Sequence, residues 1–170
     1  MWLDIAYMFL ITLVPALELR ASIPWGALYQ GHSLWLVTPV CIVANILLGI
    51  VWFKFVAWFE KKLERFGWFH RRWVWFCNRA QMKIQRGVDR WGTLGVAFFI
   101  GIPLPGSGVY TGGLGAYLLG LSFRQFLIAN AVGVLIAGTA VTLVVVLGPD
   151  TFGWLYDLFV KELPPEGMGG

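Results

Sequence analysis

Charge is scarce in this sequence, and so are cysteine and histidine. Only 13% of the 170 residues are charged, which is about half the share that a soluble globular domain carries. With 58% hydrophobic residues and a mean hydropathy of +0.72, the chain cannot cover itself with a polar surface. The scarcity of charge therefore excludes an ordinary soluble domain and indicates an integral membrane protein.

The two cysteines, Cys41 and Cys77, and the two histidines, His32 and His70, are isolated from one another in the sequence. No CxxC pair and no histidine at ligand spacing is present, so we expect no metal, no disulfide and no cofactor. Each histidine is interpreted as an ordinary interfacial residue. The sequence also has no HExxH motif and no GxxxxGK[ST] loop, which favours a protein that is not an enzyme and does not itself use ATP.

Two long uncharged runs indicate the membrane spans. Residues 33–53 form an uncharged run of 21 residues, and residues 126–149 form one of 24. About 20 apolar residues cross a bilayer as a helix. We therefore expect one span at about 33–58 and another at about 122–147.

Positive charge is concentrated between these two spans. Ten of the 13 lysine and arginine residues fall between Lys54 and Arg90, and several recur at helical spacing among tryptophan and phenylalanine residues. Residues 60–91 are thus predicted to form an amphipathic helix in the membrane interface, next to anionic lipid head groups. The positive-inside rule places this helix in the cytoplasm, and membrane lipids, not nucleic acid, are its expected partners.

Each side of the basic segment carries an apolar half that begins with an interrupted hydrophobic stretch. The interruptions are "VPALELRASIP" (14–24) and "IPLPGSGVYTGG" (102–113). The flanking pieces are too short to cross a bilayer, so each half is predicted to be a re-entrant hairpin followed by one spanning helix. "GALYQGHSL" (26–34) matches "GAYLLGLSF" (115–123) at Gly, Ala, Gly and Ser, and "IVANILLG" resembles "LIANAVG". These matches indicate a repeat.

The repeat fixes a predicted topology. A hairpin returns to its starting face and one span then crosses, so the two halves must have opposite orientations. The predicted fold is all-α, a single membrane domain (1–170) with inverted repeats at 3–59 and 92–148 joined by the 60–91 helix. Residues 149–170 are expected to form an amphipathic segment and a flexible tail. The protein is then a multi-pass inner-membrane protein with both termini outside the cytoplasm.

Proline and glycine account for the two interruptions. Proline ends a helix, and glycine lets the backbone turn. Broken backbone survives at membrane depth only where it is buried in protein or lines a wet cavity, so the two breaks are predicted to meet near the midplane. The helix that resumes after the second break would present its amino end to an anion. The residues predicted to break the helices are Pro15, Pro24, Pro103, Pro105, Gly106 and Gly108.

Few polar side chains are available near these breaks. Glu18 and Arg20 either pair with each other or cap helix ends, or they form a site in which Glu18 accepts a proton and Arg20 holds a phosphate or carboxylate. Asn45 and Asn130 either pack helices through hydrogen bonds or line the site, and Arg124 is either a snorkelling interfacial residue or a substrate ligand. The candidate substrate- and ion-binding residues are Glu18, Arg20, Ser22, Asn45, Ser107, Tyr110, Thr111, Arg124 and Asn130.

The loops "ELRASIP" (18–24) and "PLPGSGVYTGG" (103–113) resemble the two signature loops of the small multi-drug export protein family. That family is similar to the wider DedA-like membrane proteins, and the resemblance extends over about residues 5–150. Ala21 stands where the family commonly has Gly, and Tyr110 stands where it often has Trp. The resemblance implies two re-entrant hairpins that face each other and a role in membrane transport. The DedA-like relatives imply proton-dependent movement of phospholipids or polyprenyl phosphates.

The sequence thus predicts a membrane transporter, secondary and coupled to protons or another ion. Its substrate would be an anionic or amphipathic small molecule or a lipid-linked phosphate. The alternatives are a non-transporting assembly or scaffold protein and a passive lipid scramblase. A homo-oligomer, most simply a dimer, is also expected, because one such chain has little protein with which to shield its broken segments from lipid.

Overall fold

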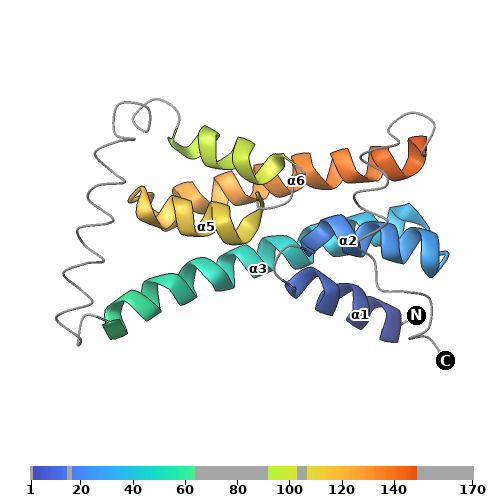
Figure 1. The fold of residues 1–170 in the computed structure, drawn as a ribbon, viewed down its shortest axis with the longest axis horizontal. Coiled ribbons are helices and arrows are strands. Elements are labelled where there is room, and N and C mark those ends of the chain that lie inside the picture. The colour runs from blue at the N-terminus through green and yellow to red at the C-terminus, as the bar shows by residue number, and fades with distance from the viewer. Residues whose placement is uncertain (1, 15–16, 64–91, 103–106, 149–170) are drawn as a thin grey trace. The chain divides into compact units, whose positions relative to one another are not determined.

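The computed structural model describes residues 2–14, 17–63, 92–102 and 107–148, and every regular element in these ranges is helical. The predicted all-α class is confirmed for this part of the chain. Most of the predicted 60–91 helix, and the 149–170 segment, lie outside the described residues. In chain order the elements are α1 (Trp2–Leu13), α2 (Glu18–Pro24), the π-helix η1 (Trp25–Tyr29), α3 (Leu34–Leu63), a helix over Gly92–Gly101, α5 (Val109–Leu118) and α6 (Phe123–Leu147) (Figure 1).

Two of these helices, α3 and α6, are long and apolar enough to cross a membrane. They occupy the positions predicted for the two spans. The first helix is longer than expected, because α3 remains helical to Leu63 and includes Lys61 and Lys62 in its last turn. At 1.5 Å per residue its 30 residues are about 45 Å long, so α3 extends beyond the hydrocarbon core of a bilayer.

Both predicted interruptions are present, but each is shorter than the sequence suggested. The first covers only residues 14–17, because "ELRASIP" forms α2. Pro24, predicted to break the helix, is instead the last residue of α2 with helical dihedral angles (φ −58°, ψ −40°). The π-helix η1 follows directly, so the change of helix type occurs at this proline.

The second interruption ends at Gly108, since α5 begins at Val109. The residues "VYTGG" were predicted to be part of the break and are helical. Gly108 has φ 127°, a conformation that side chains rarely adopt, so glycine is needed there for the backbone to enter α5. Pro15, Pro103, Pro105 and Gly106 lie outside the described residues.

The turns that lead into the two long helices have the same construction. Four residues separate η1 from α3 and α5 from α6. The matched glycines Gly31 and Gly120 both have positive φ, 65° and 71°, which ends the preceding helix as a C-terminal glycine does. Ser33 and Ser122 then accept backbone hydrogen bonds from the first turn of the next helix. The sequence match of the two halves thus corresponds to a shared local structure.

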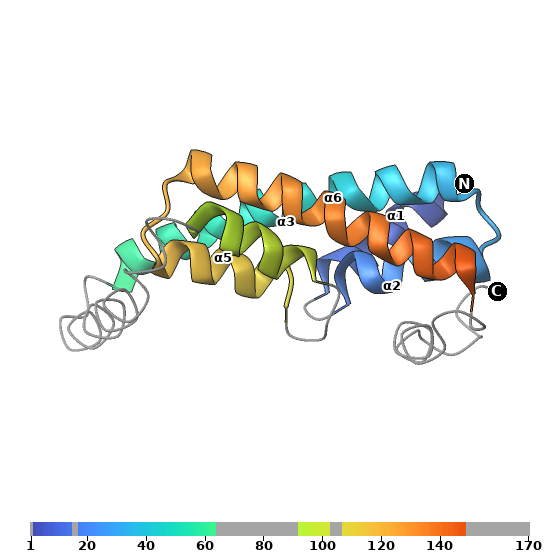
Figure 2. The same ribbon diagram turned by 90° about the horizontal axis from the view of Figure 1, so that it is seen from above.

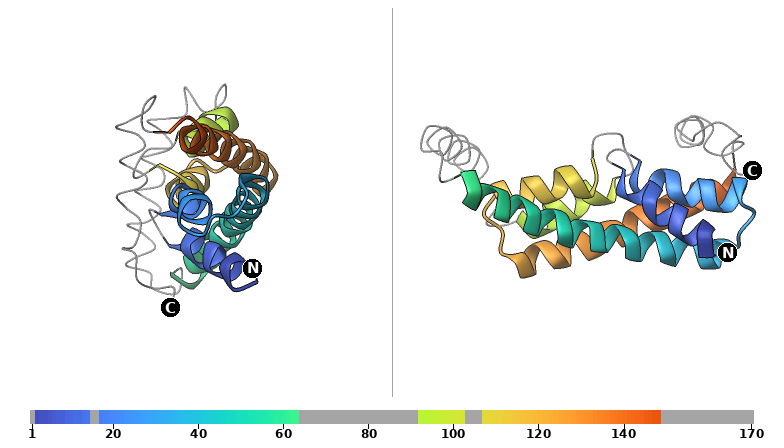
Figure 3. Two further views of the ribbon diagram at one scale, coloured as in Figure 1. Left: turned by 90° about the vertical axis from the view of Figure 1, so that its right-hand side faces the viewer. Right: turned by 90° about the horizontal axis from the view of Figure 1, so that it is seen from below.

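The chain divides into two compact units. The first contains residues 1–45 and 136–170. In it α1 and α2 form a helical hairpin along the first part of α3 (Figures 1 and 3). A Cβ on Gly26 would lie 2.7 Å from Sδ of Met8 and 2.9 Å from Cγ1 of Val37, so only glycine lets η1 approach both neighbours.

The end of α6 completes this first unit. The hydroxyl oxygens of Thr38 in α3 and Thr142 in α6 lie 2.9 Å apart. A Cβ on Gly138 would lie 2.7 Å from Cγ1 of Ile42. The two long helices are therefore in direct contact along this stretch.

The second unit, residues 46–135, contains the other hairpin, formed by helix Gly92–Gly101 and α5 (Figure 2). Ile100 fixes this hairpin, because a Cβ on Gly112 of α5 would lie 2.4 Å from its Cγ1, and a Cβ on Gly133 of α6 would lie 2.7 Å from its Cβ. The side chain of Ile100 thus occupies the space that these two glycines leave.

Aromatic side chains join α3 to the rest of the second unit. The ring of Phe53 in α3 stacks on that of Phe126 in α6 at a centroid distance of 4.5 Å, and it meets Tyr117 of α5 edge-on at 5.6 Å. Such contacts are favourable beyond the area that they bury. They hold α3, α5 and α6 together within this unit.

The units do not coincide with the predicted repeats, 3–59 and 92–148. Each unit combines one hairpin with parts of both α3 and α6. Both halves of the chain do follow the order predicted for a repeat: short helix, break, short helix, four-residue turn, long helix. Their inverted orientation and the re-entrant path of the hairpins stay predictions.

Candidate functional site

The first hairpin buries two charged side chains. Glu18 and Arg20 are in the first turn of α2 and are only 4% and 6% exposed. Each takes part in interactions with other groups of the protein. A charged side chain costs about 2.5–3.5 kcal/mol at the centre of a bilayer on insertion scales, so residues of this kind are retained where they have a function or a strong partner.

Glu18 also has an unusual backbone conformation. Its φ is 47°, and no other non-glycine residue in the described ranges has a positive φ. This left-handed conformation costs an L-residue roughly 1–2 kcal/mol. Strain of this kind is concentrated at functional sites, where the surrounding structure holds it in place. The carboxyl group is therefore positioned by a backbone that glycine or asparagine would adopt more easily.

A buried hydroxyl cluster lies one turn further along α2. Oγ of Ser22 donates a hydrogen bond to the carbonyl oxygen of Glu18 at 3.1 Å, and Oγ1 of Thr12 lies 2.9 Å from Oγ of Ser22 and 2.7 Å from the carbonyl oxygen of Met8. The thiol of Cys41 in α3 lies close to both hydroxyl groups. Thr12, Ser22 and Cys41 are all fully buried, and together they link α1, α2 and α3.

This cluster extends the site that the sequence predicted. Ser22 was a candidate, whereas Thr12 and Cys41 were not. Three oxygen–oxygen contacts join Thr12 and Ser22 to each other and to the carbonyl oxygens of Met8 and Glu18. Only the two hydroxyl protons of Thr12 and Ser22 are available for these contacts, so the protons can be arranged in more than one way.

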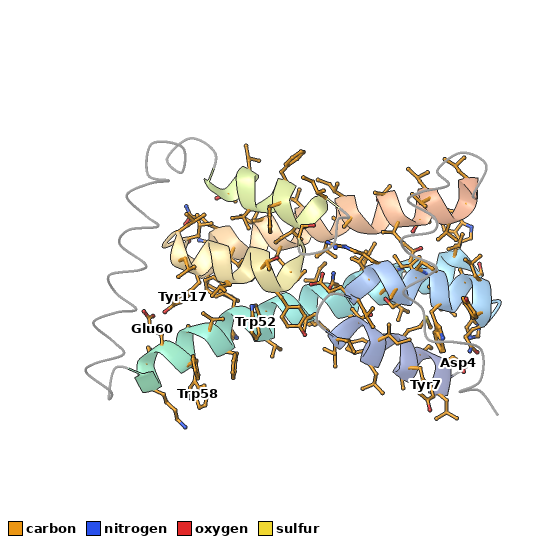
Figure 4. All side chains as sticks on the ribbon, in the orientation of Figure 1. Asp4, Tyr7, Trp52, Trp58, Glu60 and Tyr117 are labelled. Atoms are coloured by element: carbon orange, nitrogen blue, oxygen red, sulfur yellow. The ribbon has the colours of Figure 1, made fainter. Side chains whose placement is uncertain are left out.

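The open end of the first hairpin is closed by a hydrogen bond between Asp4 and His32 that sequence reasoning missed. Nε2 of His32, in the turn before α3, lies 3.1 Å from Oδ2 of Asp4 in α1. Hydrogen bonds from the α-amino group and then from His32 lower the pKa of the Asp4 carboxyl. Next to these two residues, the rings of Tyr7 and Trp25 face each other with their centroids 6.2 Å apart. Figure 4 shows Asp4 and Tyr7 at the same end of the hairpin.

In the second hairpin the hydroxyl groups of Ser107 and Thr111 contact the backbone, and Tyr110 is held through its carbonyl oxygen. Oγ of Ser107 donates to the carbonyl oxygen of Ile102 at 2.6 Å and so connects the two ends of the break. Oγ1 of Thr111 lies 3.5 Å from the carbonyl oxygen of Gly108. The carbonyl oxygen of Tyr110 accepts a hydrogen bond from Nε1 of Trp52 at 2.8 Å, and the two rings meet edge-on. These contacts position the beginning of α5.

Asn130 and Asn45 are fully buried in the long helices. Nδ2 of Asn130 donates to the carbonyl oxygen of Ile46 at 3.1 Å, and Gly49 leaves the space for this side chain, since a Cβ there would lie 2.4 Å from Nδ2. The Oδ1 atoms of both asparagines have no hydrogen-bond partner among the described residues. Each Oδ1 atom is therefore a buried acceptor that is available to a donor group, and helix packing alone does not require such an acceptor.

Arg124 differs from the other candidates because it is exposed in the first turn of α6. The helix begins with Ser122 and Gln125, whose side chains bond each other and the backbone in the manner of a capping box. Its exposed position agrees with the interfacial interpretation of Arg124. No group of three or more His, Cys, Asp or Glu residues in the described ranges could hold a metal ion.

The predicted site residues therefore fall into two groups. The first unit contains Glu18, Arg20, Ser22 and Asn45, and the second contains the remaining candidates. In the first unit the chemistry is a buried acid, a buried guanidinium and a hydroxyl cluster. In the second unit it is a break whose ends are joined by the hydrogen bond of Ser107, together with the buried side-chain amide of Asn130. The predicted meeting of the two breaks stays a prediction.

The model of a family described as "Putative small multi-drug export protein" matches residues 18–140 of the 170-residue chain. The match begins at Glu18, the first residue of α2, and includes the second interruption, all of α3 and most of α6. No curated protein and no solved structure matches the chain.

Proposed function

This chain belongs to the small multi-drug export protein family, and on that basis we propose that it is a secondary transporter of the inner membrane. Its substrate would be an anionic or amphipathic small molecule or a lipid-linked phosphate, and its driving force a gradient of protons or another ion. The observation that carries this proposal is the burial of Glu18 and Arg20 in α2, within a chain that has two helices of membrane-spanning length.

In the proposed mechanism each of the two residues has one task. The carboxyl group of Glu18 takes up and releases a proton, since it is a buried ionisable group in a chain with two helices of membrane-spanning length. The guanidinium group of Arg20 binds the anionic group of the substrate, for which its planar set of donors is well suited. Protonation of Glu18 changes the charge beside Arg20, which couples substrate binding to proton uptake.

The proposed architecture follows the sequence prediction. Two inverted, re-entrant hairpins of DedA-like type would bring the breaks at 14–17 and 102–108 together near the midplane, and the amino end of α5 would favour an anion. A homodimer would shield the hairpins from lipid. The chain would be oriented with the 60–91 segment in the cytoplasm and both termini outside.

The direct test is transport by the purified protein in liposomes with and without a pH gradient, using a fluorescent amphipathic anion as the probe. Glu18→Gln should remove the dependence on the gradient, and Arg20→Ala should raise the KM for the anion, whereas Arg20→Lys should retain part of its binding. Asp4→Asn, an acid outside the buried site, is the matched control and should behave like the parent. Folding of each variant is checked by its unfolding transition.

If Glu18→Gln and Arg20→Ala fold and transport like the parent, the two residues are structural and this mechanism is wrong. Movement of lipid or anion that never depends on the gradient would instead identify a passive scramblase. The absence of any movement in the parent would favour an assembly or scaffold protein.

The orientation is tested separately by labelling single cysteines in a variant without Cys41 and Cys77. Cysteines at Lys61 and Ser122 should react from the cytoplasmic side, and one at Gln30 should react only from outside. Reaction of the Ser122 and Gln30 positions from the same side would contradict the inverted repeat.

A further inference from the structure

One face of α3 near its C-terminal end has exposed aromatic side chains. Phe55, Trp58 and Phe59 are 45%, 51% and 46% exposed, and the rings of Trp58 and Phe59 both lie 5.9 Å from that of Phe55. Their spacing of three and four residues places them on one side of the helix. Lys62, one turn later, has its Nζ atom 4.4 Å from the centre of the Trp58 ring. We call these four residues the aromatic stripe.

The other side of this helical segment is occupied. Phe53 and Val56 are buried inside the second unit, and Glu60 accepts a hydrogen bond from the hydroxyl group of Tyr117 in α5. Figure 4 shows Glu60 and Tyr117 close together, with Trp58 on the opposite side of α3. The aromatic stripe is thus the free face of a helix whose packing face is already used.

Positive charge surrounds the stripe. Lys54, Lys61 and Lys62 are exposed, and Lys54 has its Nζ atom 5.4 Å from the centre of the Phe123 ring. The nearby acid, Glu60, is directed toward Tyr117. A surface of stacked rings edged by ammonium groups matches the chemistry of a phospholipid at the membrane interface, where rings lie among head groups and cations attract phosphate.

We propose that the aromatic stripe, with Lys54 and Lys61 beside it, is a binding site for an anionic phospholipid. The acyl chain runs along Phe55 and Phe59, and the head group lies against the ammonium groups of Lys61 and Lys62. Trp58 orients Lys62, because the cation is held over the face of its ring.

Positive charge argues against other parts of the protein as the group that covers the aromatic stripe. A second copy of this chain on a two-fold axis would place the same lysines opposite one another, which opposes association. Residues 64–91 contain seven lysine and arginine residues and only two acids, so this segment repels the stripe as well. An anionic lipid has the opposite charge and is present at the interface.

The test is lipid binding to the purified full-length protein, measured by native mass spectrometry with phosphatidylglycerol and with phosphatidylcholine of the same acyl chains. The parent should bind phosphatidylglycerol more tightly. Lys62→Gln should weaken that binding about fivefold, the contribution expected of one lysine at an anionic surface, and leave phosphatidylcholine unchanged. Lys62→Arg should restore the preference.

Trp58→Leu tests the ring, and Trp35→Leu is its control. Both tryptophans are exposed on α3, Trp35 at 92%, but Trp35 is at the other end of the helix. Trp58→Leu should reduce the preference for phosphatidylglycerol, and Trp35→Leu should not. Since both side chains are exposed, neither change should alter folding.

Three results would overturn the proposal. Equal affinity of the parent for the two lipids would show that no anionic site exists. Loss of the preference in Arg71→Gln/Arg72→Gln but not in Lys62→Gln would assign the lipid to the basic segment instead. A change in the mass of the assembly on Trp58→Leu would show that the stripe is an interface between copies of the chain.

Discussion

Gly112 is the position at which a single added methyl group tests the packing of the second hairpin most directly. A Cβ there would lie 2.4 Å from Cγ1 and 2.9 Å from Cδ1 of Ile100, which is 1% exposed. The β-branched side chain of Ile100 has few alternative rotamers, and Gly133 of α6 confines it on another side. Gly112→Ala must therefore displace α5 from the helix that precedes it.

The expected magnitude follows from two opposing effects. Overpacking of a core costs about 1–3 kcal/mol, and alanine in place of glycine returns up to about 1 kcal/mol of helix propensity. Gly112→Ala should therefore lower the free energy of unfolding by about 1–2 kcal/mol. Gly115 lies in the same helix with nothing within 4 Å of its Cβ position, so Gly115→Ala should raise that free energy by about 0.5–1 kcal/mol.

The assay is reversible unfolding of the purified protein in mixed micelles by increasing the fraction of sodium dodecyl sulfate. Both substitutions change the unfolded chain equally, so the difference of about 2 kcal/mol between them reports packing alone. Ile100→Ala should partly rescue Gly112→Ala, because the space left by Ile100 accepts the new methyl group. If Gly112→Ala and Gly115→Ala change stability equally and in the same direction, the close approach described here is wrong.

Three further predictions use the same unfolding measurement. Gly49→Ala should cost about 1–3 kcal/mol, because its Cβ would lie 2.4 Å from Nδ2 of Asn130; an unchanged stability would contradict this contact. The pKa of Asp4 is lowered from its usual 3.8 by hydrogen bonds from the α-amino group and then from His32. The ionised carboxyl group of Asp4 therefore stabilises the folded protein above about pH 3.8, and this stabilisation is lost as the pH falls through the lowered pKa. Asp4→Asn should remove this acid dependence, and a persisting dependence would assign it to another group. Glu18→Asn should be more stable than Glu18→Gln, because asparagine tolerates the positive φ; the reverse order would remove the argument for strain.

The length of the apolar runs made the spans and the order of elements predictable, because a bilayer sets the length of a helix that crosses it. The exact bounds of the breaks were not predictable in the same way. Proline was expected to break the chain at Pro24, but α2 includes Pro24 as its last residue and continues directly into the π-helix η1. Tyr110 and Thr111 were assigned to a break because of their neighbours, whereas Gly108 absorbs the turn and lets α5 begin at once.

The polar contacts of the first hairpin follow a rule that the sequence contains. Residues that meet across the hairpin stand at similar distances from Leu17, since the two helices run in opposite directions at the same rise per residue. Thr12 meets Ser22, five residues on either side, and Met8 meets Gly26, nine residues on either side. With the turn known, these pairs could have been found. The contact of Cys41 depends on how α3 packs, which no local pattern gives.

Glu18 is central to both interpretations that the sequence left open. A structural pair with Arg20 would account for the burial of both charges, since a buried charge is stable only with a partner. Residues two apart do not face each other in a regular helix, so the positive φ of Glu18 is consistent with such a pair as well. The left-handed conformation and the buried carboxyl each oppose folding, and both occur at one residue. That combination is expected where the position of a carboxyl group matters more than stability, and it is the physical reason to test Glu18 first as the residue that takes up the proton.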